Sequence, residues 1–251
     1  MISVANLWRH PIKSHGREAL EIIMLSEGQT IPWDRHWAVA HDKTKFDAAD
    51  PAWVMCRNFV IGALTPEVAG IWAQFDEDAG LMTLTHTRLG EVTFRPDDPV
   101  DATRFLNWVA PLTNTVSFKP VSLVSLGARG MTDTDYPSVS IMSHATNNAV
   151  AAIAGKPLEA ERWRGNIWLD GTAPWEEFEW FGRDLRIGNA VLHVREPVKR
   201  CRHPAVNPQT GQRDTDVINI LNNSFGHQNF GIYAEVIQSG HIALGDTAEV
   251  L

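Results

Sequence analysis

Short runs of β-branched and aromatic residues, broken by glycine, serine and proline, are the sequence feature that most restricts the fold of this chain. Such runs with turn residues between them are typical of β-strands in a meander. The strands expected near the two ends of the chain are 4–12, 19–25, 33–41, 231–238 and 248–251.

Two hairpins are predicted in the interior of the chain. Residues 81–87 and 91–95 form the first, with its turn near Gly90. Residues 185–187 and 190–194 form the second, because the intervening pair Gly188-Asn189 is a strong signal for a two-residue hairpin turn.

Helices are expected at only three places, each beginning after a polar capping residue. Asp101 is predicted to cap a helix that runs through Val109 and ends before Pro111. The other two are a helix after Ser143 that is stopped by Gly155, and a short helix after Asp216 that ends before Gly226. Many strands and few helices predict a mainly β fold, either a barrel or a sandwich, with a loop-like boundary at 127–137.

The formal charge of −8 over 251 residues gives no reason to expect nucleic acid or anionic lipid as a partner. The chain has two cysteines, too few for a disulfide framework, so a reducing compartment is expected. The start of the sequence does not resemble a secretory signal, and no apolar run approaches the ~18 residues of a membrane span. These observations predict a cytoplasmic protein without a membrane partner.

Residues 162–170 combine closely spaced cations with apolar residues. If the segment is a strand, Arg162, Arg164 and Asn166 share one face, where the two guanidinium groups suit a phosphate or carboxylate. From spacing alone, a solvated sheet face with the arginines paired to Glu159 and Glu161 is the stronger interpretation.

Residues 196–204 place Cys201 among Lys199, Arg200 and Arg202. Positive neighbours favour the thiolate, the form that attacks electrophiles or binds metal. A half-buried structural cysteine explains the segment equally well. A structural zinc site would need four well-spaced ligands, so it is disfavoured. Cys56 lies in an apolar context and is expected to serve packing.

A third group of cations lies at predicted strand ends, where Lys13-Ser14 and Arg35 could hold an anionic group. No Walker-type glycine spacing precedes Lys13, so a P-loop is excluded. Ordinary surface charge at a strand end is the stronger interpretation when these residues are considered alone.

Taken together, these segments resemble the MOSC family, the proteins related to the C-terminal domain of molybdenum cofactor sulfurase. The resemblance covers nearly the whole chain and implies an N-terminal β-barrel domain at 1–120 followed by a MOSC β-barrel domain at 121–251. The segments that carry it are 7–14, 33–37, 162–167, 175–177, 187–188, 200–201, 229–233 and 245–246.

The resemblance implies a molybdenum cofactor, a molybdopterin, with the thiolate of Cys201 as both metal ligand and catalytic group. Arg200 would sit beside that ligand, and Ser143 would place a helix N-terminus at the cofactor phosphate. The remaining residues that match cofactor-lining positions are Lys13, Ser14, Arg35, Arg162, Arg164 and Asn166.

Members similar to the mitochondrial amidoxime-reducing component imply an oxidoreductase that removes oxygen from N-hydroxylated small molecules. Electrons would come from a separate donor protein, of ferredoxin, flavoprotein or haem type. A second hypothesis is a carrier that bears a persulfide on Cys201 or holds the cofactor for delivery. A third, a β-barrel binding module without chemistry, is disfavoured by the combination of Cys201 with the cations.

Overall fold

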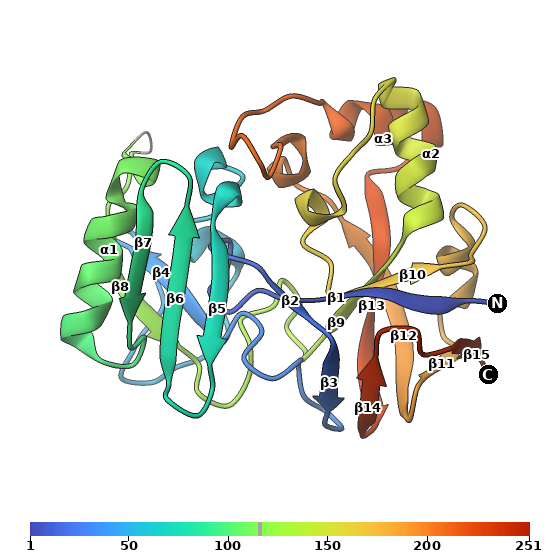
Figure 1. Ribbon diagram of the computed structural model, residues 1–251, viewed down its shortest axis with the longest axis horizontal. Helices are drawn as coiled ribbons and strands as arrows, with labels where there is room; N and C mark the ends of the chain where they lie inside the picture. The colour runs from blue at the N-terminus through green and yellow to red at the C-terminus, as the bar shows by residue number, and fades with distance from the viewer. Residues whose placement is uncertain (115–116) are drawn as a thin grey trace.

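The computed structural model describes residues 1–114 and 117–251. The fold is mainly β with three α-helices, as the sequence predicts. Figure 1 shows two halves side by side, one holding β4–β8 and α1, the other holding β9–β15 with α2 and α3. The first strand, β1 (Ser3–Arg9), belongs to the second half, although it comes first in the chain.

The second half is built on an eight-stranded sheet in the order β15-β11-β12-β13-β9-β10-β1-β2. Antiparallel pairing dominates, while β9 and β10 run parallel. The strands not yet given bounds are β2 (Glu18–Leu20), β9 (Val139–Ser143), β10 (Ile167–Asp170), β11 (Asp184–Ile187), β12 (Ala190–Lys199), β13 (Asn229–Gln238) and β15 (Ala248–Val250).

Backbone hydrogen bonds close this sheet into a barrel. The N–H of Val4 donates to the carbonyl of Asp246 at 2.9 Å, and the N–H of Ala248 donates to the carbonyl of Ile2 at 3.0 Å. The N-terminal part of β1 therefore contacts the chain just before β15, the strand at the other end of the sheet order. Closure removes the free edges and encloses an apolar core that includes Leu7 and Leu192.

The first half consists of a three-stranded sheet β5-β6-β7, a two-stranded pair β4-β8, and one helix. Its core includes Trp37, Phe94 and Phe105, and the last two rings stack at 5.0 Å. The elements are β4 (Trp37–His41), β5 (Trp72–Asp76), β6 (Leu81–His86), β7 (Gly90–Phe94), α1 (Pro99–Thr113) and β8 (Pro120–Ser125).

Both predicted hairpins are confirmed, as β6-β7 and β11-β12. Helices α2 (His144–Ala154) and α3 (Val217–Phe225) begin after Ser143 and Asp216 and end at glycines, as expected. The predicted start and end of the first helix are wrong. Asp98 is the residue that caps α1, and Pro111 lies inside its last turn, where it removes one i→i−4 hydrogen bond only two residues before the helix ends.

The predicted strand at 19–25 is wrong as a single strand, because β2 pairs with β1 whereas β3 (Ile22–Leu25) pairs with β14 (Gly240–Ala243). The strand predicted at 33–41 begins only at Trp37, since Trp33 and Arg35 have left-handed backbones. The predicted division at residue 120 stays a prediction. Strand pairing crosses it three times, in β1-β10, in β4-β8 and in β3-β14.

Candidate functional site

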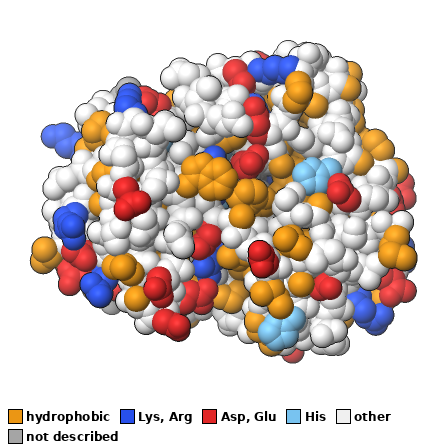
Figure 2. Space-filling view, viewed as in Figure 1, with side chains coloured by type: hydrophobic (Ala, Val, Ile, Leu, Met, Phe, Trp, Pro, Cys, Tyr) orange, Lys and Arg blue, Asp and Glu red, His pale blue; other side chains and the backbone are white. Residues whose placement is uncertain are grey.

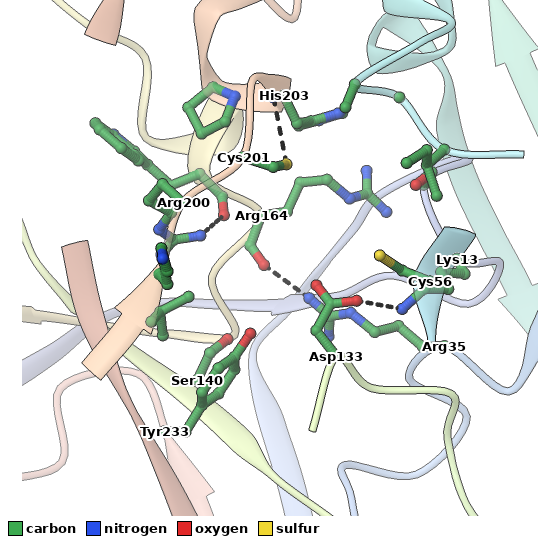
Figure 3. Close-up of a pocket in the computed structure, with 18 residues that line it drawn as sticks. Lys13, Arg35, Cys56, Asp133, Ser140, Arg164, Arg200, Cys201, His203 and Tyr233 are labelled. Atoms are coloured by element: carbon green, nitrogen blue, oxygen red, sulfur yellow. Dashed lines mark hydrogen bonds and ion pairs between the residues drawn. The ribbon is translucent and has the colours of Figure 1, made fainter. Parts of the chain in front are cut away.

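A cavity lies between the two halves of the molecule, with about 760 Å³ of space free of protein atoms, part of which is open to solvent. That size is within the range of small-molecule and cofactor sites. Six residues predicted to take part in the site line it: Lys13, Ser14, Arg35, Arg164, Arg200 and Cys201. Figure 3 shows several of them pointing toward its centre.

Strained backbone gathers at this cavity. Ser14, Arg35 and Arg164 have φ angles of 66°, 51° and 51°, a left-handed conformation that is uncommon for residues other than glycine. Only five non-glycine residues among those described have positive φ, and three of them line the cavity. Such clusters are typical of functional sites, where the surrounding structure holds side chains in place.

Arg35 joins the two halves beneath the cavity. Its guanidinium pairs with the buried carboxylate of Asp34 and donates to the backbone carbonyl of Arg164 at 2.9 Å. Although burial alone would raise the pKa of Asp34, Arg35 and His10 hold that pKa well below its ordinary value. Asp34 is therefore a fixed negative charge that anchors Arg35.

Lys13 lies at the same wall of the cavity. Its ammonium group donates to the carbonyl of Met131 at 2.7 Å and to Asp133 at 2.5 Å. Burial would raise the pKa of Asp133, but Lys13, Arg35 and Arg200 lower it, so its carboxylate is ionised. Asp133 is exposed to the cavity space and lies in a loop that the sequence analysis treated only as a boundary.

Arg164 has few partners within the protein. Its guanidinium donates one hydrogen bond, to the carbonyl of Gly16 at 3.0 Å, and no carboxylate among the described residues forms an ion pair with it. Burial, together with the charges of Arg35 and Arg17, lowers its pKa to about 9. A cation so placed favours an anionic ligand in the cavity.

Arg200 is positioned by the backbone and by aromatic rings. Its guanidinium donates to the carbonyls of Phe230 and Trp163 at 2.7 and 2.8 Å, and it lies over both rings at 5.6 and 5.5 Å. Burial lowers its pKa to about 10, so it stays charged at neutral pH. Arg200 therefore supplies positive charge while it fixes the cavity wall.

Cys201 follows the end of β12, and its thiol opens into the cavity. The predicted lowering of its pKa by neighbouring cations is wrong. The cavity walls desolvate the thiol and Asp133 adds a negative charge, so the pKa of Cys201 is raised despite Arg200. Cys56, expected to serve packing, lines the same cavity, and Figure 3 shows both thiols directed into it.

Three predicted cofactor residues do not line the cavity. The strand that would have placed Arg162 beside Arg164 is absent, because residues Ala160–Trp163 form a 3-10 helix and β10 begins only at Ile167. Arg162 is fully buried and pairs with Glu159 and with Asp214 at 3.2 Å. The guanidinium group of Arg162 is thus bound by partners within the protein.

Asn166 and Ser143 are also occupied within the fold. Asn166 Oδ1 accepts from the Ser140 hydroxyl at 2.7 Å, and its amide donates to the carbonyl of Trp8 at 3.2 Å. Ser143 is completely buried, caps α2 through Thr146, and bonds the hydroxyl of Thr172 at 2.7 Å. Ser143 therefore does not place the N-terminus of α2 at the cavity.

Further cavity residues were not singled out from the sequence: Ser140, Trp163, Tyr233 and His203. Figure 3 shows the hydroxyls of Ser140 and Tyr233 next to each other. Burial raises the pKa of Tyr233, so its hydroxyl keeps its proton. Two signals in the sequence pointed to these residues. Tyr233 lies in segment 229–233, where the register of strand β13 sets its direction, and His203 lies in segment 196–204, close to Cys201.

Two family models cover nearly all of the chain. Residues 1–116 match the MOSC N-terminal beta barrel domain, and residues 131–249 match the MOSC domain. The chain belongs to the MOSC family. This MOSC protein thus has the predicted order, an N-terminal β-barrel domain followed by a MOSC domain.

Curated relatives of this MOSC protein include molybdenum cofactor sulfurases. A stretch of 104 residues is 36% identical to the protein of Drosophila grimshawi, covering 38% of this chain and 13% of that protein. A stretch of 73 residues is 36% identical to the protein of Bos taurus, covering 29% and 8%. The chain thus spans only a small part of the length of these relatives.

Solved structures with similarity to this MOSC protein have low sequence identity to it. The YUAD protein from Bacillus subtilis aligns with 100% of this chain and 96% of its own, at a TM-score of 0.47 and 15% identity. YiiM from Geobacillus stearothermophilus aligns with 45% of this chain and 53% of its own, at a TM-score of 0.34 and 18% identity.

The donor set of the cavity fits a molybdenum cofactor better than an all-protein metal site. Within residues 1–114 and 117–251, no three His, Cys, Asp or Glu side chains form a group that could hold a metal. The exposed thiol of Cys201 beside cations, with Arg164 lacking a carboxylate partner among the described residues, suits a metal that arrives with its own sulfur ligands and a phosphate.

The cations around the cavity are not part of a broad basic surface. Figure 2 shows Lys and Arg side chains of one face mainly toward its outer margin.

None of the helices in the described part of the chain combines the length and apolar character needed to cross a bilayer.

Proposed function

We propose that this MOSC protein is an oxidoreductase that uses a molybdenum cofactor to reduce N-hydroxylated and other N-oxygenated small molecules. Cys201 would be the protein ligand of molybdenum, and a separate donor protein would supply electrons. The observation that carries the proposal is the juxtaposition of an accessible thiol with cations that outnumber the carboxylates in one cavity.

The cationic residues would hold the anionic part of the cofactor. Arg164 has most of its guanidinium free of protein partners, and Lys13 has one carboxylate partner, Asp133, which is itself exposed to the cavity. Arg35 is held in place by Asp34 and can add charge without moving. A phosphate placed among them would replace water by fixed donors.

When bound, the cofactor would supply two-electron chemistry that removes oxygen from an N–O bond, and the protein supplies ligation, orientation and electrostatics. Tyr233 keeps its proton, so its hydroxyl can donate a hydrogen bond to an oxygen atom in the cavity. Asp133 is ionised and held by Lys13, so its carboxylate can accept a hydrogen bond from an N–H or O–H group of the substrate and orient it.

Apolar residues form another wall of the cavity, at Ile61, Ala63 and Val198. This wall suits the hydrocarbon or aromatic part of a substrate, whereas the polar N–O group would face the charged side. The proposed substrate is therefore a small molecule with an apolar body and a single polar N-oxygenated end.

A carrier is the second candidate. It is favoured by the similarity of parts of the chain to proteins named molybdenum cofactor sulfurase and by the accessibility of Cys201. In this role Cys201 would bear a persulfide or hold the cofactor for transfer. Small-molecule substrate, donor protein and cytoplasmic location all stay predictions.

The deciding experiment is elemental analysis of the protein purified from a host that makes the cofactor. The reductase predicts stoichiometric molybdenum and turnover of benzamidoxime with an artificial electron donor. A persulfide carrier predicts metal-free protein with sulfane sulfur on Cys201, and a cofactor carrier predicts molybdenum without turnover of benzamidoxime. Cys56→Ala is the matched control, because this second thiol lines the same cavity but is assigned no ligand role.

A further inference from the structure

His203 and Gly62 make a close contact between the two halves of the molecule beside the cavity. A Cβ built on Gly62 would lie 2.2 Å from Nδ1 and 2.4 Å from Cε1 of the His203 ring. The imidazole therefore occupies the space that any other residue at position 62 would need. Gly62 does not have a left-handed backbone, so the requirement for glycine here is one of space.

This contact is one of several between the segment that follows Cys201 and the N-terminal half. Arg213 Nη2 donates to the carbonyl of Ala63 at 2.7 Å, and a Cβ built on Gly211 would lie 3.0 Å from Cα of Glu67. His203 is the member of this group nearest in sequence to the thiol, and it lines the cavity together with Gly62 and Cys201.

The backbone of His203 also contacts the thiol directly. Its N–H donates to Cys201 Sγ at 3.5 Å, so a shift of residue 203 would move the sulfur or break this contact. His203 is 8% exposed and is the first residue of a 3-10 helix, His203–Ala205. The ring thus couples the position of Gly62 in one half to the position of Sγ in the other.

We propose that His203 is a positioning residue whose imidazole, packed against Gly62, sets where the thiol of Cys201 lies in the cavity. The proposal rests on the proposed function only in treating Cys201 as the functional atom. It assigns the N-terminal half a direct part in forming the site, since Gly62 supplies the surface on which the ring packs.

The test compares alkylation of Cys201 by iodoacetamide at one fixed pH, followed by mass spectrometry, in full-length protein carrying Cys56→Ser. We expect Gly62→Ala and His203→Ala each to change the rate about threefold or more, because thiol reactivity follows its immediate surroundings. In the double variant, the methyl group of Ala at 62 enters the space left by the ring. Adding Gly62→Ala to His203→Ala should therefore leave the rate unchanged.

Gly70→Ala is the matched control. A Cβ at position 70 would lie 2.9 Å from Nε2 of His86, which is a similar glycine–imidazole contact outside this cavity. It should lower the melting temperature and leave the alkylation rate of Cys201 as it was. An equal change of the alkylation rate in Gly70→Ala would overturn the proposal. It would also be overturned if Gly62→Ala changed the rate by the same factor in wild-type protein and in His203→Ala.

Should Gly62→Ala fail to fold, His203→Ala alone decides, because loss of the ring creates no overlap and an unchanged rate would overturn the proposal. Molybdenum content is measured in the same preparations. Wild-type protein without molybdenum would contradict the proposed function, and the alkylation comparison would still test the role of His203.

Discussion

The guanidinium of Arg35 donates a hydrogen bond of 2.9 Å to the backbone carbonyl of Arg164, a residue 129 positions further along the chain. Both residues have left-handed backbones, and both line the cavity. This bond joins the N-terminal segment to the turn before β10, so two distant pieces of sequence form one wall.

Arg35→Lys tests this connection. Lysine keeps the charge, but it lacks the planar guanidinium group with which Arg35 binds Asp34 and the carbonyl of Arg164 at the same time. We expect a loss of about 1–3 kcal/mol in the free energy of unfolding and a lower molybdenum content. Denaturant unfolding measures the stability, and elemental analysis measures the molybdenum content. A variant that matches wild type in both would show that the guanidinium group of Arg35 is not needed.

Arg164→Ala and Arg162→Ala form a matched pair with opposite expectations. Arg164 makes one side-chain hydrogen bond, so its loss should change stability by no more than about 1 kcal/mol while cofactor retention falls. Loss of Arg162 leaves Glu159 and Asp214 without their buried partner and should cost about 3–5 kcal/mol. Equal loss of stability in both would place Arg164 in a structural role.

Cys201→Ala is expected to abolish molybdenum retention and leave the fold intact. The thiol is exposed to the cavity and packs little, so the free energy of unfolding should change by about 0.5 kcal/mol or less. Elemental analysis and circular dichroism check the two parts. A variant that keeps its full molybdenum would contradict the assignment of the ligand.

Glu177→Gln is expected to remove a pH dependence of stability. Glu177 is buried, with one oxygen bonded by the Thr146 hydroxyl and the other without a partner among the described residues, and burial raises its pKa from 4.5 to about 7. Between these two values the folded protein holds a proton that the unfolded chain has released, so stability falls as pH rises. At about 1.4 kcal/mol per unit, the total loss is at most about 3.5 kcal/mol.

Glutamine resembles the protonated form and keeps an acceptor for Thr146. The melting temperature of Glu177→Gln should therefore match that of wild type near about pH 4 and exceed it near about pH 8. The same difference between variant and wild type at both pH values would show that Glu177 does not titrate in this range.

Local sequence signals predicted those elements whose limits are local. The pair Gly188-Asn189 fixed a hairpin, and Ser143 and Asp216 fixed helix starts, because turn geometry and capping involve only neighbouring residues. The split between β2 and β3 depends instead on their partners, β1 and β14, which no local pattern reveals.

The same distinction applies to the site. Cys201 and the strand-end cations could be singled out because charge and thiol chemistry are visible in the residues themselves. Arg162 and Asn166 were misplaced because the alternation of a strand was assumed where the backbone turns at Arg164. Asp133 and Cys56 reach the cavity only through the packing of the two halves, which sequence spacing does not encode.

The closing of the eight-stranded barrel by β1 has a consequence for biosynthesis. Strand β1 must pair with β10, and its start must meet residues 246–248, which are synthesised much later than β1. The two halves therefore cannot mature independently in order of translation, and a fragment beginning at residue 131 would expose the unpaired edge of β10. Residues 1–130, supplied as a separate chain, would provide β1 again. We therefore expect the two fragments to associate and to complement each other.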